Sequence, residues 1–137
     1  MSPAPPDALV LLVEDEDDDV FFMQLAYEAA GISQKLERLS NGQEAMDYLE
    51  SRALPALIFL DLKLPLRTGF EVLTWMHEKG IRVPTIVLST SAEPRDVQRA
   101  YGLCANSFLV KPASQDEFTS LLRLVKAYWL ERNIYTP

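Results

Sequence analysis

Hydrophobic and polar positions along the chain alternate between two kinds of segment. Short apolar runs of four or five residues are separated by longer stretches in which apolar residues recur at helical spacing. The runs Leu9 to Val13, Ala56 to Leu60, Thr85 to Leu88 and Ser107 to Val110 predict strands that are buried on both faces. The segment Gln34 to Leu39 alternates polar and apolar residues, which predicts a strand at or near a sheet edge.

The stretches between these runs carry the start and stop signals of helices. The first helix is expected to place Phe22, Met23, Ala26 and Ala30 on one face and to end at Gly31. Capping-box spacing predicts three further helix starts, at Ser40 with Gln43, Thr68 with Glu71, and Ser114 with Glu117. Pro94 suits the first turn of a fourth helix. Gly80 and Gly102 lie where helix C-caps are expected. The last helix is expected to bury Phe118, Leu121, Leu122 and Val125, with the stripe continuing to Tyr128 and Trp129.

This alternation of strand and helix, repeated five times, predicts an α/β fold. Such a pattern builds a doubly wound, five-stranded parallel sheet with helices on both faces. The alternating second strand favours the flavodoxin-like order 2-1-3-4-5. The 137 residues, 48% of them hydrophobic, suffice for one packed domain. We expect a disordered leader over residues 1–6, which holds three prolines, a domain over residues 7–131 and a tail over residues 132–137.

Charge and cysteine usage narrow the classes of function. The formal charge is −7, from 20 acidic and 13 basic residues, which disfavours a nucleic-acid partner because phosphate backbones are bound by Lys and Arg. No apolar run is long enough for a signal peptide or a membrane span, so we expect a soluble, cytoplasmic protein without a membrane partner. Cys104 is the only cysteine and is expected to be a packed thiol, while His77 is expected on the surface.

Five polar residues lie just past the ends of four predicted strands. They are Glu14 and Asp15, Asp61, Ser89 and Lys111. In an open parallel sheet, ligands bind outside the carboxyl ends of the strands, at the point where successive strands wind to opposite sides. The predicted strand order places the first strand beside the third. The three carboxylates should therefore meet in one crevice with a hydroxyl and an ammonium.

This set of side chains suits a metal ion together with a phosphoryl group. Carboxylates within a few ångströms repel one another, so one keeps a proton or a cation lies among them. Mg²⁺ prefers oxygen ligands and is usually bound by one or two carboxylates plus a phosphate oxygen. Lys111 offers a point charge to a phosphoryl group and Ser89 a hydroxyl donor. Asp61, the central carboxylate, is the candidate nucleophile, because carboxylates can accept a phosphoryl group as an acyl phosphate.

Four motifs at these positions resemble one known family. They are VEDE at Val13 to Glu16, FLDLKLPLRTG at Phe59 to Gly69, VLST at Val87 to Thr90, and FLVKP at Phe108 to Pro112. Their order and spacing resemble the receiver domain of two-component response regulators, from Leu9 to about Glu131.

The resemblance implies a role for each residue of the site. Asp61 is the implied phosphoacceptor. The implied Mg²⁺ ligands are Glu14, Asp15 and Asp61, with Lys63 contributing its backbone carbonyl. Lys111 would pair with the phosphoryl group. Ser89, in place of the more frequent threonine, and Phe108 would be the switch residues. The resemblance also implies a cis peptide bond between Lys111 and Pro112.

The end of the chain points to a narrower group within that family. The chain ends 26 residues after Lys111, so we expect no output domain. The ending KAYWLERNIYTP, with LVEDEDDD and VLSTS, is similar to small single-domain regulators paired with bacterial and cyanobacterial phytochromes. This similarity implies a phytochrome-type histidine kinase as phosphodonor. It also implies a homodimer through the fourth helix, fifth strand and fifth helix, extended by the tail.

Two other interpretations of the acidic crevice are open. A Mg²⁺-dependent phosphatase of the haloacid-dehalogenase type also uses a strand-end aspartate nucleophile, but it places a general acid two residues later. Here that position is Lys63, which cannot serve as the acid at neutral pH. The other alternative is a structural binding module whose acidic pocket is vestigial.

Overall fold

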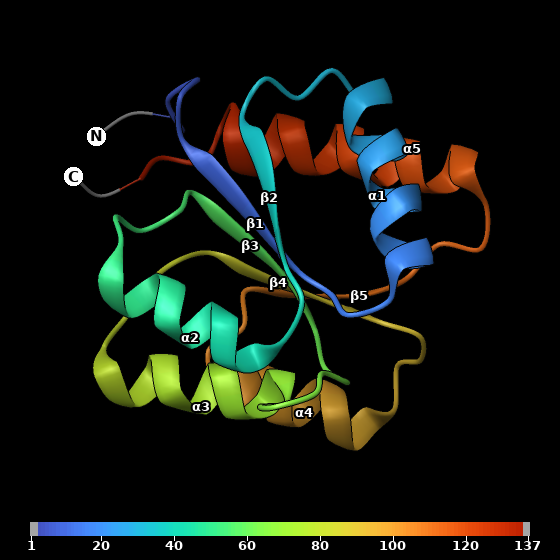
Figure 1. The fold of residues 1–137 in the computed structure, drawn as a ribbon. Helices are drawn as coiled ribbons and strands as arrows, with labels where there is room; N and C mark the ends of the chain where they lie inside the picture. The colour runs from blue at the N-terminus through green and yellow to red at the C-terminus, as the bar shows by residue number, and fades with distance from the viewer. Residues whose placement is uncertain (1–2, 136–137) are drawn as a thin grey trace.

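The fold is a three-layer α/β domain with a single parallel sheet (Figure 1). The computed structural model describes residues 3–135. The strands are β1 (Leu9–Val13), β2 (Lys35–Leu39), β3 (Leu57–Asp61), β4 (Thr85–Ser89) and β5 (Ser107–Val110). The helices are α1 (Asp17–Ala29), α2 (Gly42–Ser51), α3 (Gly69–Lys79), α4 (Pro94–Gly102), α5 (Gln115–Val125) and, directly after α5, the π-helix η1 (Lys126–Leu130). The strand order β2-β1-β3-β4-β5 confirms the predicted doubly wound fold.

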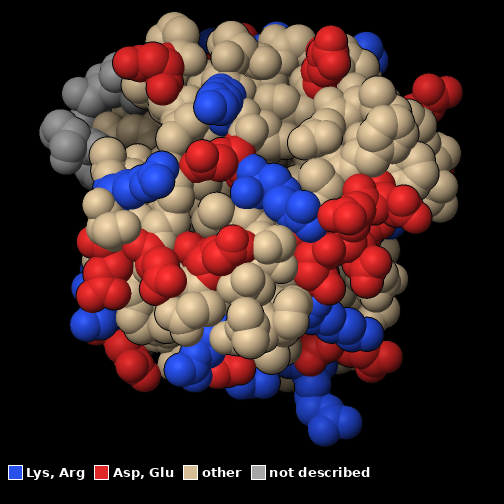
Figure 2. Space-filling model, viewed as in Figure 1, with Lys and Arg blue, Asp and Glu red and all other residues tan. Residues whose placement is uncertain are grey.

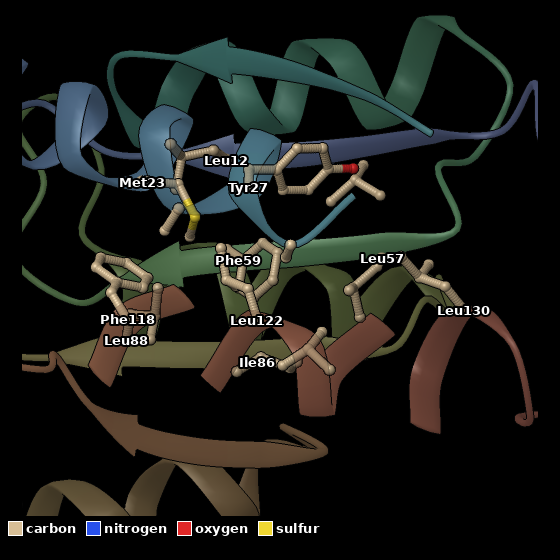
Figure 3. Close-up of a cluster of buried hydrophobic side chains, with 14 of the residues drawn as sticks. Leu12, Met23, Tyr27, Leu57, Phe59, Ile86, Leu88, Phe118, Leu122 and Leu130 are labelled. Carbon is tan, nitrogen blue, oxygen red and sulfur yellow. The ribbon is translucent and has the colours of Figure 1, made fainter. Parts of the chain in front are cut away.

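Each face of the sheet has its own hydrophobic core. Helices α1 and α5 cover one face, and α2, α3 and α4 cover the other (Figure 1). Figure 3 shows the first core, in which Met23 and Tyr27 of α1 meet Phe59 of β3 and Phe118 and Leu122 of α5. The central strands β1, β3 and β4 are buried on both faces, as their apolar runs predict.

The two edge strands differ from the central ones in burial. β2 is partly exposed along its length, which confirms the edge position predicted from its alternation. β5 forms the opposite edge, and its residue Val110 is 48% exposed. The prediction that β5 is buried on both faces is therefore wrong. The predicted strand order already placed β5 at an edge, but its apolar sequence could not indicate how much of its faces the helices would leave uncovered.

Most of the predicted helix ends are confirmed, and two are shifted. Thr68 and Glu71 form a complete capping box, and Gly80 is a left-handed C-cap. The Ser114 side chain accepts a hydrogen bond from the Glu117 backbone N–H.

The N-cap of α2 is Asn41, whose side chain accepts from the Glu44 N–H, so the prediction of a Ser40 and Gln43 pair is wrong by one residue. Helix α4 includes Gly102, and the left-handed residue after it is Cys104. The Gly102 C-cap prediction is therefore also wrong.

Some surface assignments also need correction. Phe22 and Tyr128, which their spacing placed on the apolar faces of the first and last helices, are 47% and 61% exposed. Cys104 is exposed as well, with its Sγ 3.5 Å from Nδ1 of the exposed His77.

The N-terminal segment also packs more than expected. Ala4 is buried in the first core, and the Gln34 side chain donates to the Ala4 and Pro5 carbonyls at 3.5 and 3.3 Å. The expected lack of packing in the leader is therefore wrong for this residue, while residues 1–2 lie outside the described part. Between residues 3 and 135, no helix combines the length and hydropathy that crossing a membrane requires.

Candidate functional site

Three carboxylates meet at the carboxyl ends of β1 and β3. Glu14 and Asp15 follow β1, Asp61 ends β3, and the two strands are hydrogen-bonded neighbours. One carboxylate oxygen from each of the three lies within 4.8 Å of the others. Three hard oxygen donors at this spacing, partly open to solvent at Asp15, form a set that can hold a divalent ion. The structure thus brings together the three acids that the sequence singled out.

Lys111, just past the end of β5, reaches across the same pocket. Its Nζ lies 2.7 Å from Glu14 Oε1, 2.9 Å from Asp19 Oδ2 and 3.7 Å from Asp61 Oδ2. The Lys111 side chain is 16% exposed, so these ion pairs are shielded from bulk water. One ammonium therefore faces several carboxylates, and the pocket keeps an excess of negative charge.

Burial and these contacts shift the pKa values of the pair. Burial raises the pKa of the Glu14 carboxyl to about 7; the hydrogen bond from Lys111 opposes this effect, and the Asp61 charge adds to it. For Lys111, burial by itself lowers the pKa of the ammonium. Its hydrogen bonds to Glu14 and Asp19, and the nearby Asp61, outweigh that effect and raise the pKa above its ordinary value. Lys111 therefore stays charged at neutral pH.

The loop between β3 and α3 places Lys63 beside the candidate nucleophile. The Lys63 backbone N–H donates to Asp61 Oδ1 at 3.4 Å, which leaves Asp61 Oδ2 toward Lys111. Gly69 closes the loop, and its N–H donates to the Leu62 carbonyl at 2.9 Å. A Cβ on Gly69 would lie 2.4 Å from the Asp61 carbonyl oxygen, so the close approach that supports Asp61 requires glycine here.

The two predicted switch residues lie on neighbouring strands. Ser89 ends β4 and is buried, and its hydroxyl oxygen accepts a hydrogen bond from the Ser91 N–H at 3.3 Å. Phe108 lies on β5 opposite Val87, and its backbone N–H donates to the Tyr101 hydroxyl at 3.1 Å.

One local prediction at this edge of the site is wrong. Residues 3–135 contain no cis peptide bond, so the Lys111–Pro112 bond is trans and not cis as the resemblance implied.

Two polar contacts of the site were not predicted from the sequence. Asp19, in the first turn of α1, binds Lys111 directly. It lies four residues after Asp15 along the chain, and this closeness in sequence was the available signal. Arg38 of β2 donates to the backbone carbonyls of both Glu14 and Asp15. No motif marks Arg38, because its role depends on the reach of a side chain from an adjacent strand.

This arrangement defines a class of protein, an open α/β domain that carries an acidic, lysine-containing pocket at its strand ends. Comparison with known sequences identifies the family within that class. The response regulator receiver domain model matches residues 10–123, so the chain belongs to the receiver domain family.

Two similar proteins extend along most of the chain. Response regulator Rcp1 of Synechocystis sp. is 33% identical over 134 residues, which cover 92% of this chain and 91% of that protein. The "Probable methanogenesis regulatory protein FilR2" of Methanothrix harundinacea is 36% identical over 132 residues, 91% of this chain and 85% of that protein.

Solved structures give the same result. The Mn²⁺-bound form of Rcp1 has a TM-score of 0.83 at 30% identity, covering 95% of this chain and 99% of that one. The phosphorylated cyanobacterial phytochrome response regulator RcpA has a TM-score of 0.85 at 29% identity, covering 93% and 97%.

These findings decide between the alternatives drawn from the sequence. The chain is a response regulator with a phosphoacceptor role in two-component signalling, and its similar proteins include phytochrome response regulators. The phosphatase interpretation is not supported. Receiver domains use Mg²⁺, and the cluster of Glu14, Asp15 and Asp61 is placed to hold such an ion.

Proposed function

We propose that Asp61 is the phosphoacceptor and that Glu14, Asp15 and the Lys63 carbonyl bind Mg²⁺ beside it. The observation that carries this proposal is the approach of three carboxylates to within 4.8 Å around a buried aspartate, with the Lys111 ammonium 3.7 Å from that aspartate. When bound, the ion would offset the negative charge that gathers on the phosphoryl oxygens.

Asp61 and Lys111 have separate roles in phosphoryl transfer. An Asp61 carboxylate oxygen attacks the phosphorus of a kinase phosphohistidine; the new bond joins that oxygen to phosphorus, and the bond that breaks joins phosphorus to the histidine nitrogen. Lys111 orients the phosphoryl group by its positive charge.

The same transfer would set the conformational switch. The Ser89 hydroxyl donates to a phosphoryl oxygen, and Phe108 turns toward the space that Ser89 leaves, which shifts the surface between two states.

Replacement of the acceptor tests this assignment. Asp61→Asn should abolish incorporation of labelled phosphate from a small acyl phosphate with Mg²⁺, because an amide cannot form the acyl phosphate. The exposed acidic residue Asp18 offers a matched control, and Asp18→Asn should keep full labelling. Persistent labelling of the Asp61→Asn protein would reject Asp61 as the acceptor.

We also propose a phytochrome-type histidine kinase as the donor and a homodimer as the working form. The support for the donor is the similarity to RcpA and Rcp1 along nearly the whole chain. Support for the dimer comes from exposed apolar side chains on the side formed by α4, β5 and α5. Tyr101, Val110, Leu124 and Tyr128 are 49%, 48%, 68% and 61% exposed.

The donor can be tested by phosphotransfer from purified histidine kinases. A phytochrome-type kinase should transfer to this protein faster than unrelated kinases, and equal rates for all of them would argue against the pairing.

The dimer can be tested by sedimentation. Leu124→Asp, or truncation after Glu131, should give monomers, while Leu54→Asp, at a 51% exposed position after α2, should not. Unchanged sedimentation of both interface variants would argue against the proposed dimer.

A further inference from the structure

The guanidinium of Arg38 binds the turn that presents the metal-binding acids. Arg38 lies on β2 opposite Leu12 of β1, so its side chain extends over the face of the sheet that α1 covers. Its Nε donates to the Glu14 carbonyl at 2.9 Å, and its Nη2 donates to the Asp15 carbonyl at 3.1 Å and to Asp17 Oδ1 at 3.0 Å. The Arg38 side chain is 28% exposed, whereas Asp17 is 89% exposed.

The two carbonyls that Arg38 binds lie beyond the end of the hydrogen-bond ladder between β1 and β2. The pairing of β1 with β2 ends at Val13. The last backbone hydrogen bond between the two segments is donated by the Glu14 N–H to the Leu39 carbonyl. Carbonyls at such a turn need donors from elsewhere. The rigid, planar guanidinium of an arginine can donate hydrogen bonds to two carbonyls at once. The single ammonium of lysine cannot reproduce that geometry.

We propose that Arg38 is a positioning residue for the phosphoryl-accepting site. By fixing the backbone of Glu14 and Asp15 it aims both carboxylates at Asp61, although the guanidinium itself touches neither carboxylate. In Figure 2, acidic side chains gather where α1 begins, with basic side chains beside them. This inference rests on the proposed metal site and adds a residue of β2 to it.

Removal of Arg38 has two opposite effects on Mg²⁺ binding. Loss of a positive charge near the acidic cluster favours the cation. Loss of the backbone contacts loosens the ligands, and loss of the hydrogen-bond partners that orient metal ligands typically weakens metal binding by about 10-fold to 100-fold. The sign of the change therefore distinguishes a positioning role from a purely electrostatic one.

Mg²⁺ titration of four proteins tests the proposal. We expect Arg38→Ala and Arg38→Lys each to raise the Mg²⁺ dissociation constant about tenfold, because lysine keeps the charge but not the fork. Asp17→Asn, which removes only the exposed partner of Arg38, should bind Mg²⁺ like the wild type. Adding ethylguanidinium to Arg38→Ala should restore most of the affinity, while adding ethylammonium should not.

The outcomes separate this inference from the proposed metal site. Unchanged or tighter Mg²⁺ binding by both Arg38 variants would overturn the positioning role, as would a weakening that ethylguanidinium does not relieve. If the wild type itself binds no Mg²⁺, the proposed metal site fails instead. Circular dichroism of each variant without metal checks that the fold is retained, and Arg38→Lys, which keeps the stem and the charge, decides the question if Arg38→Ala unfolds.

Discussion

At the scale of single residues, Lys111 determines how the pocket balances its charges. Its ammonium already contacts Glu14 and Asp19, with Asp61 at 3.7 Å. A phosphoryl group on Asp61 would add negative charge nearby, so Lys111 would have to weaken a carboxylate contact to bind the new group. The strand-end position of Lys111 could be predicted from the sequence. Its pairing with Asp19 could not, because Asp19 lies within α1 and the strand-end pattern marks only the residues that follow strands.

Tyr27 gives a prediction of pH dependence at the same scale. Burial raises the pKa of its hydroxyl above the ordinary value of 10, and the hydroxyl donates to the Gln34 carbonyl at 2.7 Å. Above pH 10 the unfolded chain releases this proton and the folded chain keeps it, so the free energy of unfolding falls as pH rises. The loss for Tyr27 should be about 1.4 kcal/mol per pH unit.

Comparison with Tyr27→Phe isolates this effect from the other tyrosines. The variant lacks the hydrogen bond and should be about 1 kcal/mol less stable than the wild type at pH 8. The difference should vanish or change sign by about pH 11, because only the wild type has the Tyr27 proton to lose. Urea unfolding of both proteins at each pH provides the measurement, and a difference that stays constant with pH would contradict the prediction.

At the scale of elements, the position of the loop after β3 is determined by its contacts with the starts of α2 and α3. The loop rests on the start of α2, where Gly42 donates from its N–H to the Pro65 carbonyl at 3.4 Å, and it closes at Gly69. The strands themselves could be predicted, because a buried parallel strand requires an apolar run. The start of α2 was misplaced by one residue, since Ser40 and Asn41 are both good N-caps and only packing selects between them.

Gly42 is therefore a sensitive position for the loop that carries Lys63. A Cβ there would lie 2.0 Å from the Arg67 carbonyl oxygen, so Gly42→Ala must push the loop away from α2. We expect a loss of about 1–3 kcal/mol in the free energy of unfolding, as for other overpacked sites, together with slower phosphate incorporation. Urea unfolding and labelling with a small acyl phosphate measure the two effects.

Gly102 supplies the control for this substitution. It is a helical residue, and a Cβ there would meet no atom within 4 Å, so Gly102→Ala should leave stability unchanged or raise it by up to about 1 kcal/mol. Equal effects of the two substitutions on the free energy of unfolding would show that the close contact at Gly42 does not cause the loss of stability.

At the scale of the whole molecule, the sheet separates two cores that depend on different helices. Five β-α repeats left few possible topologies, and right-handed crossovers together with a polar second strand selected the observed order. The packing of the two ends of the chain could not be predicted in this way. Ala4 and Tyr135 both join the core beneath α1 and α5, and the Tyr135 hydroxyl donates to the Trp129 carbonyl at 2.7 Å. No periodic pattern marks contacts of this kind.

Leu122 tests how far the first core supports the whole domain. It is fully buried between α5 and the sheet, with Met23, Phe59 and Phe118 in the same core (Figure 3). Leu122→Ala should lower the free energy of unfolding by about 2–5 kcal/mol, because a cavity adds to the lost burial. Leu54→Ala, at a 51% exposed position, should change it by less than about 0.5 kcal/mol. Since the two cores share one sheet, urea unfolding followed by circular dichroism and by tryptophan fluorescence should show a single transition in both variants. Separate transitions for the two signals in Leu122→Ala would mean that the two faces of the sheet unfold independently.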